Sequence, residues 1–285
     1  MQFLSYNYDG KHGLAINSSA GLVGLTADEA AFPGTLLALL QAGGDALTRA
    51  GEVLHKAGRP IDMASVQVLP PVMPGKILCV GLNYADHAAE SQMQVPEVPT
   101  IFSRFASSVV GANDPIRLPR VSDKLDFEGE LAVVIGKAGR YIQRADALAH
   151  VAGYSVFNDA SIRDYQLRTP QWTIGKNFDG TGPFGPVMVT ADALPAGASG
   201  LKIATRLNGE VMQSSSTDQL IFDVSTLVAC ISEALTLEPG DVIITGTPAG
   251  VGGARKPPRF MAEGDVCEVE IEGIGLLRNP IIADV

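Results

Sequence analysis

Residues 125–136 have the sequence LDFEGELAVVIG, in which three acids two positions apart lead into an unbroken apolar run. On a β-strand, residues two apart share a face, so Asp126, Glu128 and Glu130 would crowd on one side. Like charges at that spacing disfavour each other unless solvent or a cation screens them. The acids form either a solvated strand face or, because Val133–Ile135 carries the strand into the core, a buried cation site. Carboxylate oxygens would select Mg²⁺, Mn²⁺ or Ca²⁺ rather than zinc.

The apolar part of this stretch is one of several strands predicted along the chain. Apolar runs and turn signals predict strands at Ile77–Val80, Leu131–Ile135, Lys202–Leu207, Asp241–Thr245 and Val266–Ile271. Asn208-Gly209 predicts a hairpin, because both residues tolerate positive φ. Helices are fewer and are expected near Ala145–Ala152 and from about Gln219 to Leu235. We therefore predict an α+β fold with a strand-rich domain whose sheets are antiparallel or mixed.

The N-terminal segment predicts a small α/β accessory domain. A strand and a turn at Asp9-Gly10 open it, and helices follow at Thr35–Gln41 and Ala46–Lys56. Leu69–Gly75 carries three prolines, which fit neither a strand ladder nor a helix interior, so it is interpreted as a linker. The predicted domains are residues 1–70 and a catalytic domain at residues 71–285.

Composition narrows the class of protein. Hydrophobic residues make up 46% of the 285 residues and charged residues 18%, which is enough apolar material for a sizeable core. The net charge of -10 repels phosphate backbones, so we expect no nucleic-acid partner. An anionic substrate would need local cations in its pocket.

The cysteines and the N-terminus bear on location. Cys79, Cys230 and Cys267 are odd in number and lack CxxC spacing, which argues against a disulfide framework or a zinc site and fits a reducing compartment. The first residues, MQFLSYNYDG, show neither the basic nor the apolar region of a signal peptide. No apolar run approaches the ~20 residues of a membrane span. We expect a cytoplasmic protein with no membrane partner.

Asp159 ends the apolar run GYSVFND. A carboxylate at the end of a strand commonly lines a cleft, whereas an acid before a turn often caps that turn. From the residues alone, both interpretations of Asp159 are open.

Six segments in order resemble the fumarylacetoacetate hydrolase family across roughly Lys76–Val285, in particular its shorter acylpyruvase or 2,4-diketo acid hydrolase members. The segments are GLNYADHAAE (81–90), LDFEGELAVVIG (125–136), VAGYSVFNDASIRDYQ (151–166), WTIGKNFDGTGPFGP (172–186), LEPGDVIITGTPAGVG (237–252) and GIGLLRNP (273–280). The resemblance implies a fold of layered mixed β-sheets with a β-roll, and a homodimer.

The same resemblance assigns roles to single residues. It implies that Glu128, Glu130 and Asp159 hold the metal, and that Asp126 is not a ligand. It also implies that the substrate is contacted by four residues, which are Arg163, Gln166, Lys176 and Thr247.

His87 and Glu90 are three residues apart in NYADHAAE, a spacing that places both on one face of a helical turn. Glu90 would then orient His87 and raise its basicity, so that the imidazole takes a proton from water near pH 7. The alternative is a surface His–Glu pair, which contributes little. The resemblance favours the first interpretation, because shorter family members carry a His–Glu dyad on a mobile lid here. His12, His55 and His150 lack such a setting.

Two basic residues are ambiguous from the sequence. Lys176 follows WTIG and is either desolvated beside the carboxylates or an ordinary loop lysine. Arg163 suits bidentate carboxylate binding, because its donors form a planar fork, but it could equally pair with Asp164 or another neighbour. The resemblance favours an active-site lysine and a substrate-binding arginine.

The glycine-rich segment Gly246–Gly253 is not a P-loop, because Arg255-Lys256 is followed by proline and no Lys-[Ser/Thr] occurs. We expect a tight turn that brings backbone and Thr247 near a ligand. The basic, proline-bearing segment that follows, Gly252–Phe260, either rims the pocket or is a surface loop.

The expected enzyme is a metal-dependent hydrolase that cleaves a C–C bond of a 2,4-dioxo acid, an acylpyruvate or a fumarylacetoacetate-like product of aromatic or sugar acid breakdown. Mg²⁺ is the expected ion, with Mn²⁺ or Ca²⁺ as alternatives. His87, helped by Glu90, would activate water, Lys176 would stabilise the oxyanion, and the carbanion would leave as an enolate at the ion. The alternative is a lyase or isomerase at the same site: an oxaloacetate decarboxylase or tautomerase, or a 2-oxo-pentenoate hydratase. A non-catalytic dicarboxylate binder is less favoured, because all the candidate reactive residues occur together.

Overall fold

The computed structural model describes residues 1–19, 21–90 and 94–284. Its strands are β1 Gln2–Tyr8, β2 Lys11–Ser18, β3 Gly21–Thr26, β4 Arg59–Pro60, β5 Gln67–Val68, β6 Ile77–Gly81, β7 Thr100–Arg104, β8 Val109–Val110, β9 Ile116–Leu118, β10 Leu125–Asp126, β11 Gly129–Ile135, β12 Val151–Asn158, β13 Ser161–Ile162, β14 Gly182–Thr190, β15 Lys202–Leu207, β16 Glu210–Ser216, β17 Val242–Ile244, β18 Val266–Ile271 and β19 Gly275–Ala283. Its α-helices are α1 Leu36–Ala42, α2 Ala46–Ala57, α3 Ala85–Glu90, α4 Arg163–Gln166, α5 Thr173–Lys176 and α6 Val224–Ala234.

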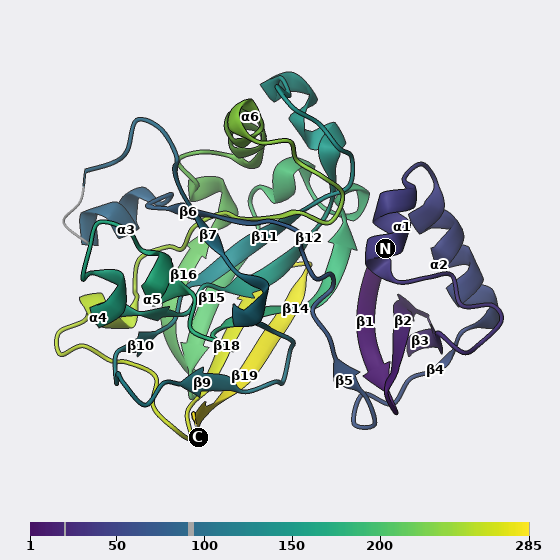
Figure 1. The fold of residues 1–285 in the computed structure, drawn as a ribbon, viewed down its shortest axis with the longest axis horizontal. Coiled ribbons are helices and arrows are strands. Elements are labelled where there is room, and N and C mark those ends of the chain that lie inside the picture. Colours follow the sequence, from purple (N-terminus) through teal and green to yellow (C-terminus); the bar gives the residue numbers. More distant parts are fainter. Residues whose placement is uncertain (20, 91–93, 285) are drawn as a thin grey trace.

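Within the described residues, these strands form sheets of twelve, five and two strands. The large sheet has the order β4-β3-β2-β1-β14-β12-β11-β17-β6-β7, with β5 beside β1 and β8 beside β14. The five-stranded sheet has the order β16-β15-β18-β19-β9 and packs against β11 and β12, while α6 lies at one end of the catalytic part (Figure 1). The pairings are mostly antiparallel with a few parallel ones, so the predicted α+β fold of layered mixed sheets is confirmed.

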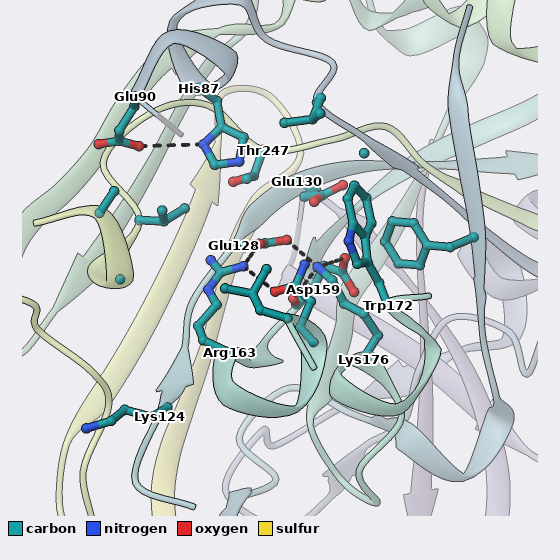
Figure 2. A pocket seen from close by; sticks show the side chains of 18 of the residues that line it. His87, Glu90, Lys124, Glu128, Glu130, Asp159, Arg163, Trp172, Lys176 and Thr247 are labelled. Carbon is teal, nitrogen blue, oxygen red and sulfur yellow. Dashed lines mark hydrogen bonds and ion pairs between the residues drawn. The ribbon is translucent and has the colours of Figure 1, made fainter. Parts of the chain in front are cut away.

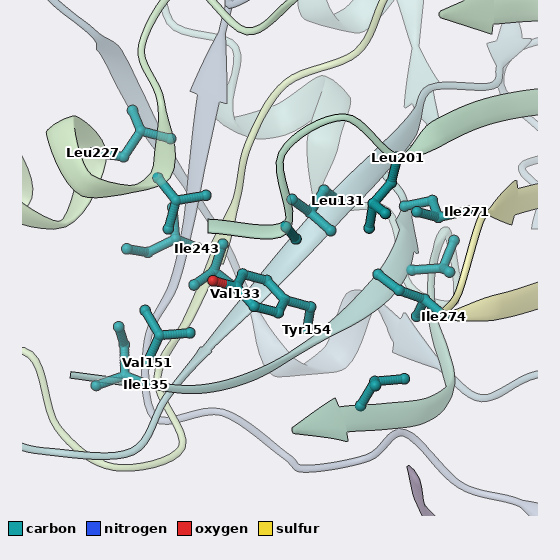
Figure 3. Packing of buried hydrophobic residues seen from close by; sticks show 14 of the residues in the cluster. Leu131, Val133, Ile135, Val151, Tyr154, Leu201, Leu227, Ile243, Ile271 and Ile274 are labelled. Atoms are coloured by element: carbon teal, nitrogen blue, oxygen red, sulfur yellow. The ribbon is translucent and has the colours of Figure 1, made fainter. Parts of the chain in front are cut away.

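Strand β11 is central in the large sheet, antiparallel to β12 on one side and to β17 on the other. Leu131, Val133 and Ile135 point into one hydrophobic cluster with residues of α6 and the five-stranded sheet (Figure 3). Ala132 and Val134 point into a second cluster with residues of α1 and α2. Because both faces are covered, the strand appears in the sequence as a continuous apolar run. Each fully buried Val, Leu or Ile side chain contributes about 1.5–3 kcal/mol.

The N-terminal strands extend the large sheet, because β1 pairs with β14 through Gln2↔Val189 and Phe3↔Met188. Helices α1 and α2 cover this edge (Figure 1). The second hydrophobic cluster joins side chains of this segment, such as Leu54, to side chains of the catalytic part, such as Phe184. The boundary near residue 70 stays a prediction.

Several predicted elements agree with the structure. Strands β15 and β18 have the predicted bounds, and Asn208 (φ 53) and Gly209 (φ 83) form the predicted turn between β15 and β16. Helix α1 begins one residue after Thr35, whose side chain caps it by accepting from Ala38 N. Cys79, Cys230 and Cys267 are free, and no helix in the described part of the chain is long and apolar enough to cross a membrane.

Two helix predictions were wrong in part. The segment Ala145–Ala152 holds a 3₁₀ helix over Arg144–His150, because Val151 already pairs with Ile135 at the start of β12. The helix expected from Gln219 begins only at Val224, where Asp223 caps it by accepting from Thr226 N.

The acidic stretch is not one continuous strand. Strand β10 ends at Asp126 and pairs with β13, while β11 begins at Gly129 and pairs with β12. The expected common face of Asp126, Glu128 and Glu130 is therefore incorrect, because the chain changes sheets between the first acid and the other two.

Candidate active site

A pocket of about 740 Å³ lies at the end of β11 and β12, where both strands meet loops of the catalytic part (Figure 2). Its polar lining residues are His87, Glu90, Lys124, Glu128, Glu130, Asp159, Arg163, Asp164, Gln166, Lys176 and Thr247. Its apolar wall includes Val80, Leu82, Phe102, Leu167, Trp172, Val251 and Phe260. The structure thus brings all nine sequence-predicted site residues to one cavity. Segment Gly252–Phe260 contributes to its rim.

Three buried carboxylates meet at the inner end of this pocket. Glu130 is the second residue of β11, and Glu128 directly precedes that strand. Asp159 follows β12, which pairs with β11, and Asp159 N donates to Glu128 O at 2.8 Å. One oxygen from each side chain lies within 4.8 Å of the other two. Asp159 does not cap the following turn, because its carboxylate oxygens accept from Arg104 and Lys176 instead.

The donor set fits a divalent cation. Burial, together with the neighbouring Asp159 and Glu128, raises the pKa of Glu130 well above its usual value. Three carboxylates so close cannot all ionise cheaply unless more positive charge joins them, and oxygen-only ligands suit Mg²⁺, Mn²⁺ or Ca²⁺. The cluster is consistent with the divalent metal that the sequence predicts.

Lys176 lies beside these acids on α5, and 2% of its surface is exposed. Its Nζ donates to Glu128 Oε2 and to Asp159 Oδ2, both at 2.6 Å, and lies 5.1 Å from the centre of the Phe102 ring. Although burial alone lowers it, the pKa of Lys176 is raised by Asp159 and Glu128. The interpretation as a solvated loop lysine is therefore wrong, and the side chain is held as an ammonium.

Arg163 and Gln166 are the first and last residues of α4. The guanidinium of Arg163 donates from Nη1 to Glu128 Oε1 at 2.5 Å and to Gln166 Oε1 at 2.9 Å, and from Nε to Asp126 Oδ2 at 2.7 Å. Burial opposes ionisation, but Lys176 and Arg163 lower the pKa of Glu128 to about 2. Arg163 pairs with Asp126 and Glu128 rather than with the adjacent Asp164.

The glycine-rich segment forms the expected tight turn. Gly246 and Gly250 adopt φ of 103° and 105°. Gly246 N donates to Glu130 Oε2, and Gly250 N donates to both oxygens of Glu90 at 3.0 Å. Between these two glycines, the Thr247 hydroxyl donates to Gly129 O at 3.0 Å. The turn therefore contacts Glu130, a predicted metal ligand, and Glu90 of the predicted dyad. Its residue Thr247 also lines the pocket.

His87 and Glu90 lie on α3 above the carboxylates (Figure 2). His87 Nδ1 is 3.5 Å from Glu90 Oε2, and the side chains are 11% and 23% exposed, so this is not a surface pair. Asp86, the second residue of α3, accepts a hydrogen bond from His87 N at 2.7 Å through its carboxylate. Burial raises the pKa of Glu90, but its bonds to His87 and to Gly250 N outweigh burial and lower that pKa overall. Glu90 is therefore an anion facing an imidazole.

Sequence reasoning missed two buried residues that hold this site together. Arg104, at the end of β7, donates to Asp159 Oδ1 at 2.6 Å and to Thr181 Oγ1 at 2.8 Å. Gln213, in β16, donates to Thr247 Oγ1 at 2.7 Å and accepts from Gly129 N at 3.0 Å. No signal in the sequence distinguishes them from surface residues, because Arg104 ends the segment TIFSR and Gln213 is one of several polar residues in EVMQSSS.

The layered α+β fold thus brings three buried carboxylates consistent with a divalent metal, a buried lysine and a His–Glu pair to one cavity, an arrangement typical of an enzyme active site. The family profile "Fumarylacetoacetate (FAA) hydrolase C-terminal" matches residues 76–282. The chain belongs to the fumarylacetoacetate hydrolase family and is an enzyme of the hydrolase, tautomerase or isomerase kind that the family contains.

Individual relatives agree with this assignment. The chain is 45% identical over 286 residues to "Oxaloacetate tautomerase FAHD2A, mitochondrial" of Bos taurus. This match covers 99% of this chain and 91% of that protein. It resembles the solved fumarylacetoacetate hydrolase of Exiguobacterium antarcticum with a TM-score of 0.87, 38% identity and full coverage of both chains. The solved 5-carboxymethyl-2-hydroxymuconate delta-isomerase of Mycobacterium smegmatis matches with a TM-score of 0.79 and 33% identity, again over both whole chains.

Proposed function

We propose that this chain is a divalent-metal-dependent tautomerase that interconverts the keto and enol forms of oxaloacetate or a closely similar 2-oxo acid. The observation that supports this most is similarity to an oxaloacetate tautomerase along 99% of the chain, with a complete set of candidate reactive residues in one cavity. We propose tautomerisation ahead of the C–C hydrolysis expected from the acylpyruvase-like segments.

Keto–enol exchange needs negative charge stabilised on the 2-oxo oxygen and a proton carried between carbon and oxygen. Bound by Glu128, Glu130 and Asp159, a divalent ion would supply Lewis acidity toward the substrate's carboxylate and 2-oxo group. The Lys176 ammonium, 2.6 Å from two of these carboxylates, adds fixed positive charge next to the same oxygen. Its raised pKa favours a role as a charge or hydrogen-bond donor rather than as a base.

The proton carrier in this proposal is His87. Of the pocket-lining side chains in the described part of the chain, only this one is a histidine, the residue type that most readily gives and takes a proton in enzymes working near neutral pH. Glu90, anchored by Gly250 N, faces His87 Nδ1 and favours a protonated imidazole after it removes a proton from the carbon next to the 2-oxo group. The same His87 then returns the proton to the enol oxygen or, in reverse, to carbon. Arg163 and Gln166 hold the substrate carboxylate, and the apolar wall at Trp172 and Phe102 excludes water.

C–C bond hydrolysis of an acylpyruvate is the second candidate, because a pocket of about 740 Å³ holds more than a four-carbon acid and the His87–Glu90 pair can also activate water. In that reaction, water loses a proton to His87 and attacks the distal carbonyl. The C–C bond then breaks, its electron pair leaves on the 2-oxo acid fragment as an enolate, and His87 returns the proton to that fragment.

Product analysis decides between these reactions. The purified protein is supplied with Mg²⁺ and either oxaloacetate or acylpyruvates, the enol absorbance is followed, and products are identified. Faster decay of the enol with oxaloacetate conserved supports the tautomerase. Two acids from an acylpyruvate support the hydrolase, and CO₂ from oxaloacetate supports a decarboxylase. A protein that alters none of these substrates, while being stabilised by them, contradicts both candidates.

A further inference from the structure

The carboxylate of Asp126 is fully buried, yet it lies outside both the cation cluster and the pocket lining of the described residues. It accepts four hydrogen bonds: from Phe127 N at 2.9 Å, Gly252 N at 2.7 Å, Gly253 N at 2.8 Å and Arg163 Nε at 2.7 Å. Three backbone groups and one guanidinium therefore converge on a single anion. A buried charge is tolerated only when it is paired and bonded in this way.

The loop around this carboxylate leaves no room for a side chain at position 252 and little room for one at position 253. A Cβ on Gly252 would lie 2.6 Å from Asp126 Oδ1 and 1.9 Å from Arg259 O. A Cβ on Gly253 would lie 3.2 Å from Asp126 Oδ2. The close approach of the two backbone N–H groups to the carboxylate therefore requires glycine at position 252 and favours it at 253. Gly253 also lines the pocket, so the carboxylate fixes part of the pocket wall.

The same carboxylate accepts a hydrogen bond from one edge of the Arg163 guanidinium. Nη1 is engaged by Glu128 and Gln166, and Nε by Asp126. Nη2 is buried and has no partner among the described residues. A buried donor left unpaired costs about 1–3 kcal/mol, so its presence in a pocket-lining residue points to a ligand group that completes it. The planar fork of Arg163 is thus largely committed to protein acids, and Nη2 is the donor left for a substrate carboxylate.

We propose that Asp126 is a positioning residue that acts through Arg163. It holds the Nε edge of the guanidinium and the Gly252–Gly253 backbone against each other, so that Nη2 meets the acid group of the substrate in a preset orientation. The proposal rests on the proposed function in one respect, because it takes Arg163 as the residue that contacts the 2-oxo acid. An amide cannot replace the carboxylate, since Asn has one acceptor oxygen and its NH₂ would face N–H donors on either side.

The first test is a double-mutant cycle built from Asp126→Asn, Arg163→Ala and the double variant, with KM and kcat measured for oxaloacetate enol. We expect Asp126→Asn to raise KM about tenfold or more with a much smaller change in kcat, since a charge-assisted contact made on binding is weakened. We expect the double variant to have the KM of Arg163→Ala within about twofold, because Asp126 is proposed to affect substrate binding through Arg163 and not through the pocket wall at Gly253. Asp123→Asn, an exposed acid three residues earlier, is the matched control and should retain wild-type KM. An unchanged KM in Asp126→Asn, or additive KM effects in the double variant, would overturn the proposal.

Two further measurements keep the proposal testable. If Asp126→Asn does not fold, Arg163→Lys keeps the charge but cannot bond Asp126 and Glu128 together, and its KM should rise as much as that of Arg163→Ala. A wild-type KM in Arg163→Lys would contradict a role for orientation. Nitrogen-15 NMR of the Arg163 Nε–H needs no turnover, so it separates failure of this proposal from failure of the proposed function. Solvent exchange of that proton should be slow in the wild type and at least about tenfold faster in Asp126→Asn; equal exchange rates would overturn the proposal.

Discussion

Lys176 places its ammonium between two acids, 2.6 Å from an oxygen of Glu128 and 2.6 Å from an oxygen of Asp159. Arg104 and Arg163 approach the same acids from other sides, while Glu130 accepts a hydrogen bond from Gly246 N. At the scale of single residues, Glu130 is therefore the acid of this cluster that forms no ion pair with any residue that the structure describes. That imbalance explains why its pKa is raised while that of Glu128 is lowered.

Replacing Lys176 by Met should lower kcat by roughly 100- to 1000-fold, because a fixed positive charge next to the developing oxyanion is lost. Steady-state kinetics with Mg²⁺ present measure this change. Lys137→Met, at an exposed position, controls for loss of a lysine elsewhere. A kcat within twofold of wild type, in a folded variant, would contradict the proposed role.

Binding of Mg²⁺ should release a proton, because an ion held by Glu130 requires its ionised form. The usual pKa of Glu130 is 4.5, and in the folded protein it is well above that value. Glu130 ionises at lower pH in the unfolded chain than in the folded one, so metal-free, chelated protein should lose stability as pH rises above 4.5. The apparent affinity for Mg²⁺ should rise over the same pH range, because the ion binds the ionised carboxylate. Calorimetry in buffers of different ionisation enthalpy counts the protons released. A Glu130→Gln variant should release fewer, and zero release by the wild type at pH 6 would contradict the assignment.

At the scale of elements, the pocket depends on contacts between segments that belong to different sheets. Strand β16 of the five-stranded sheet reaches β11 of the large sheet through Gln213, whose side chain bonds both Gly129 N and Thr247 Oγ1. Helix α3 is tied to the glycine turn through Glu90 and Gly250 N. The ends of β11 and β12 supply the acids, and these neighbouring elements set where the acids and the substrate contacts lie.

Replacing Gln213 by Ala should destabilise the fold by about 1–3 kcal/mol, because the buried Gly129 N–H loses its acceptor. The substrate KM should also rise, since Thr247 loses a bond that orients its hydroxyl. Thermal unfolding and kinetics measure both effects, with exposed Ser214→Ala on the same strand as the matched control. Wild-type stability and KM in the Ala variant would show that the amide does not position the turn.

At the scale of the whole molecule, the five-stranded sheet packs against β11 and β12 of the large sheet (Figure 1). The pocket lies where these two strands meet loops of the catalytic part. Among the residues that the structure describes, fifteen large apolar side chains are nevertheless exposed, including Phe105 at 54% and Ile174 at 63%. Such side chains are compatible with the homodimer expected from the family resemblance. Light scattering should give about twice the chain mass of 29.8 kDa; a mass of one chain at micromolar concentration would contradict the dimer.

Chelation should abolish turnover, and added Mg²⁺ or Mn²⁺ should restore it. The same ions should raise the unfolding temperature, because an ion that binds only the folded chain stabilises it by about 2.7 kcal/mol at a hundred times its Kd. Activity assays and thermal unfolding before and after metal addition measure both. Full activity in thoroughly chelated protein would contradict the metal-dependent mechanism.

Much of the fold and part of the site follow from the sequence alone. The apolar run at Leu131–Ile135 predicted a strand that enters the core, and Asn208-Gly209 predicted a hairpin, because each depends on local preference or on the apolar pattern. Glu128 and Glu130 left a cation site open as one of two interpretations, since residues two apart on an extended chain share a face. Grouping Asp126 with them was wrong, because the chain changes sheets after it. Asp159 was ambiguous, and only its resemblance to a family pattern favoured a metal role.

The tertiary structure decided what depends on pairing between distant segments. Asp126 turns away from Glu128 because the chain changes sheets at that point, and its partners Gly252 and Gly253 lie more than a hundred residues later. Arg104 reaches Asp159 across 55 residues, and Gln213 reaches Gly129 across 84. Periodicity carries no information about such contacts, because a hydrogen bond between distant strands is set by how the sheets pack. The acids could be predicted from the strand that carries them, whereas their counter-charges and supports were determined only by folding.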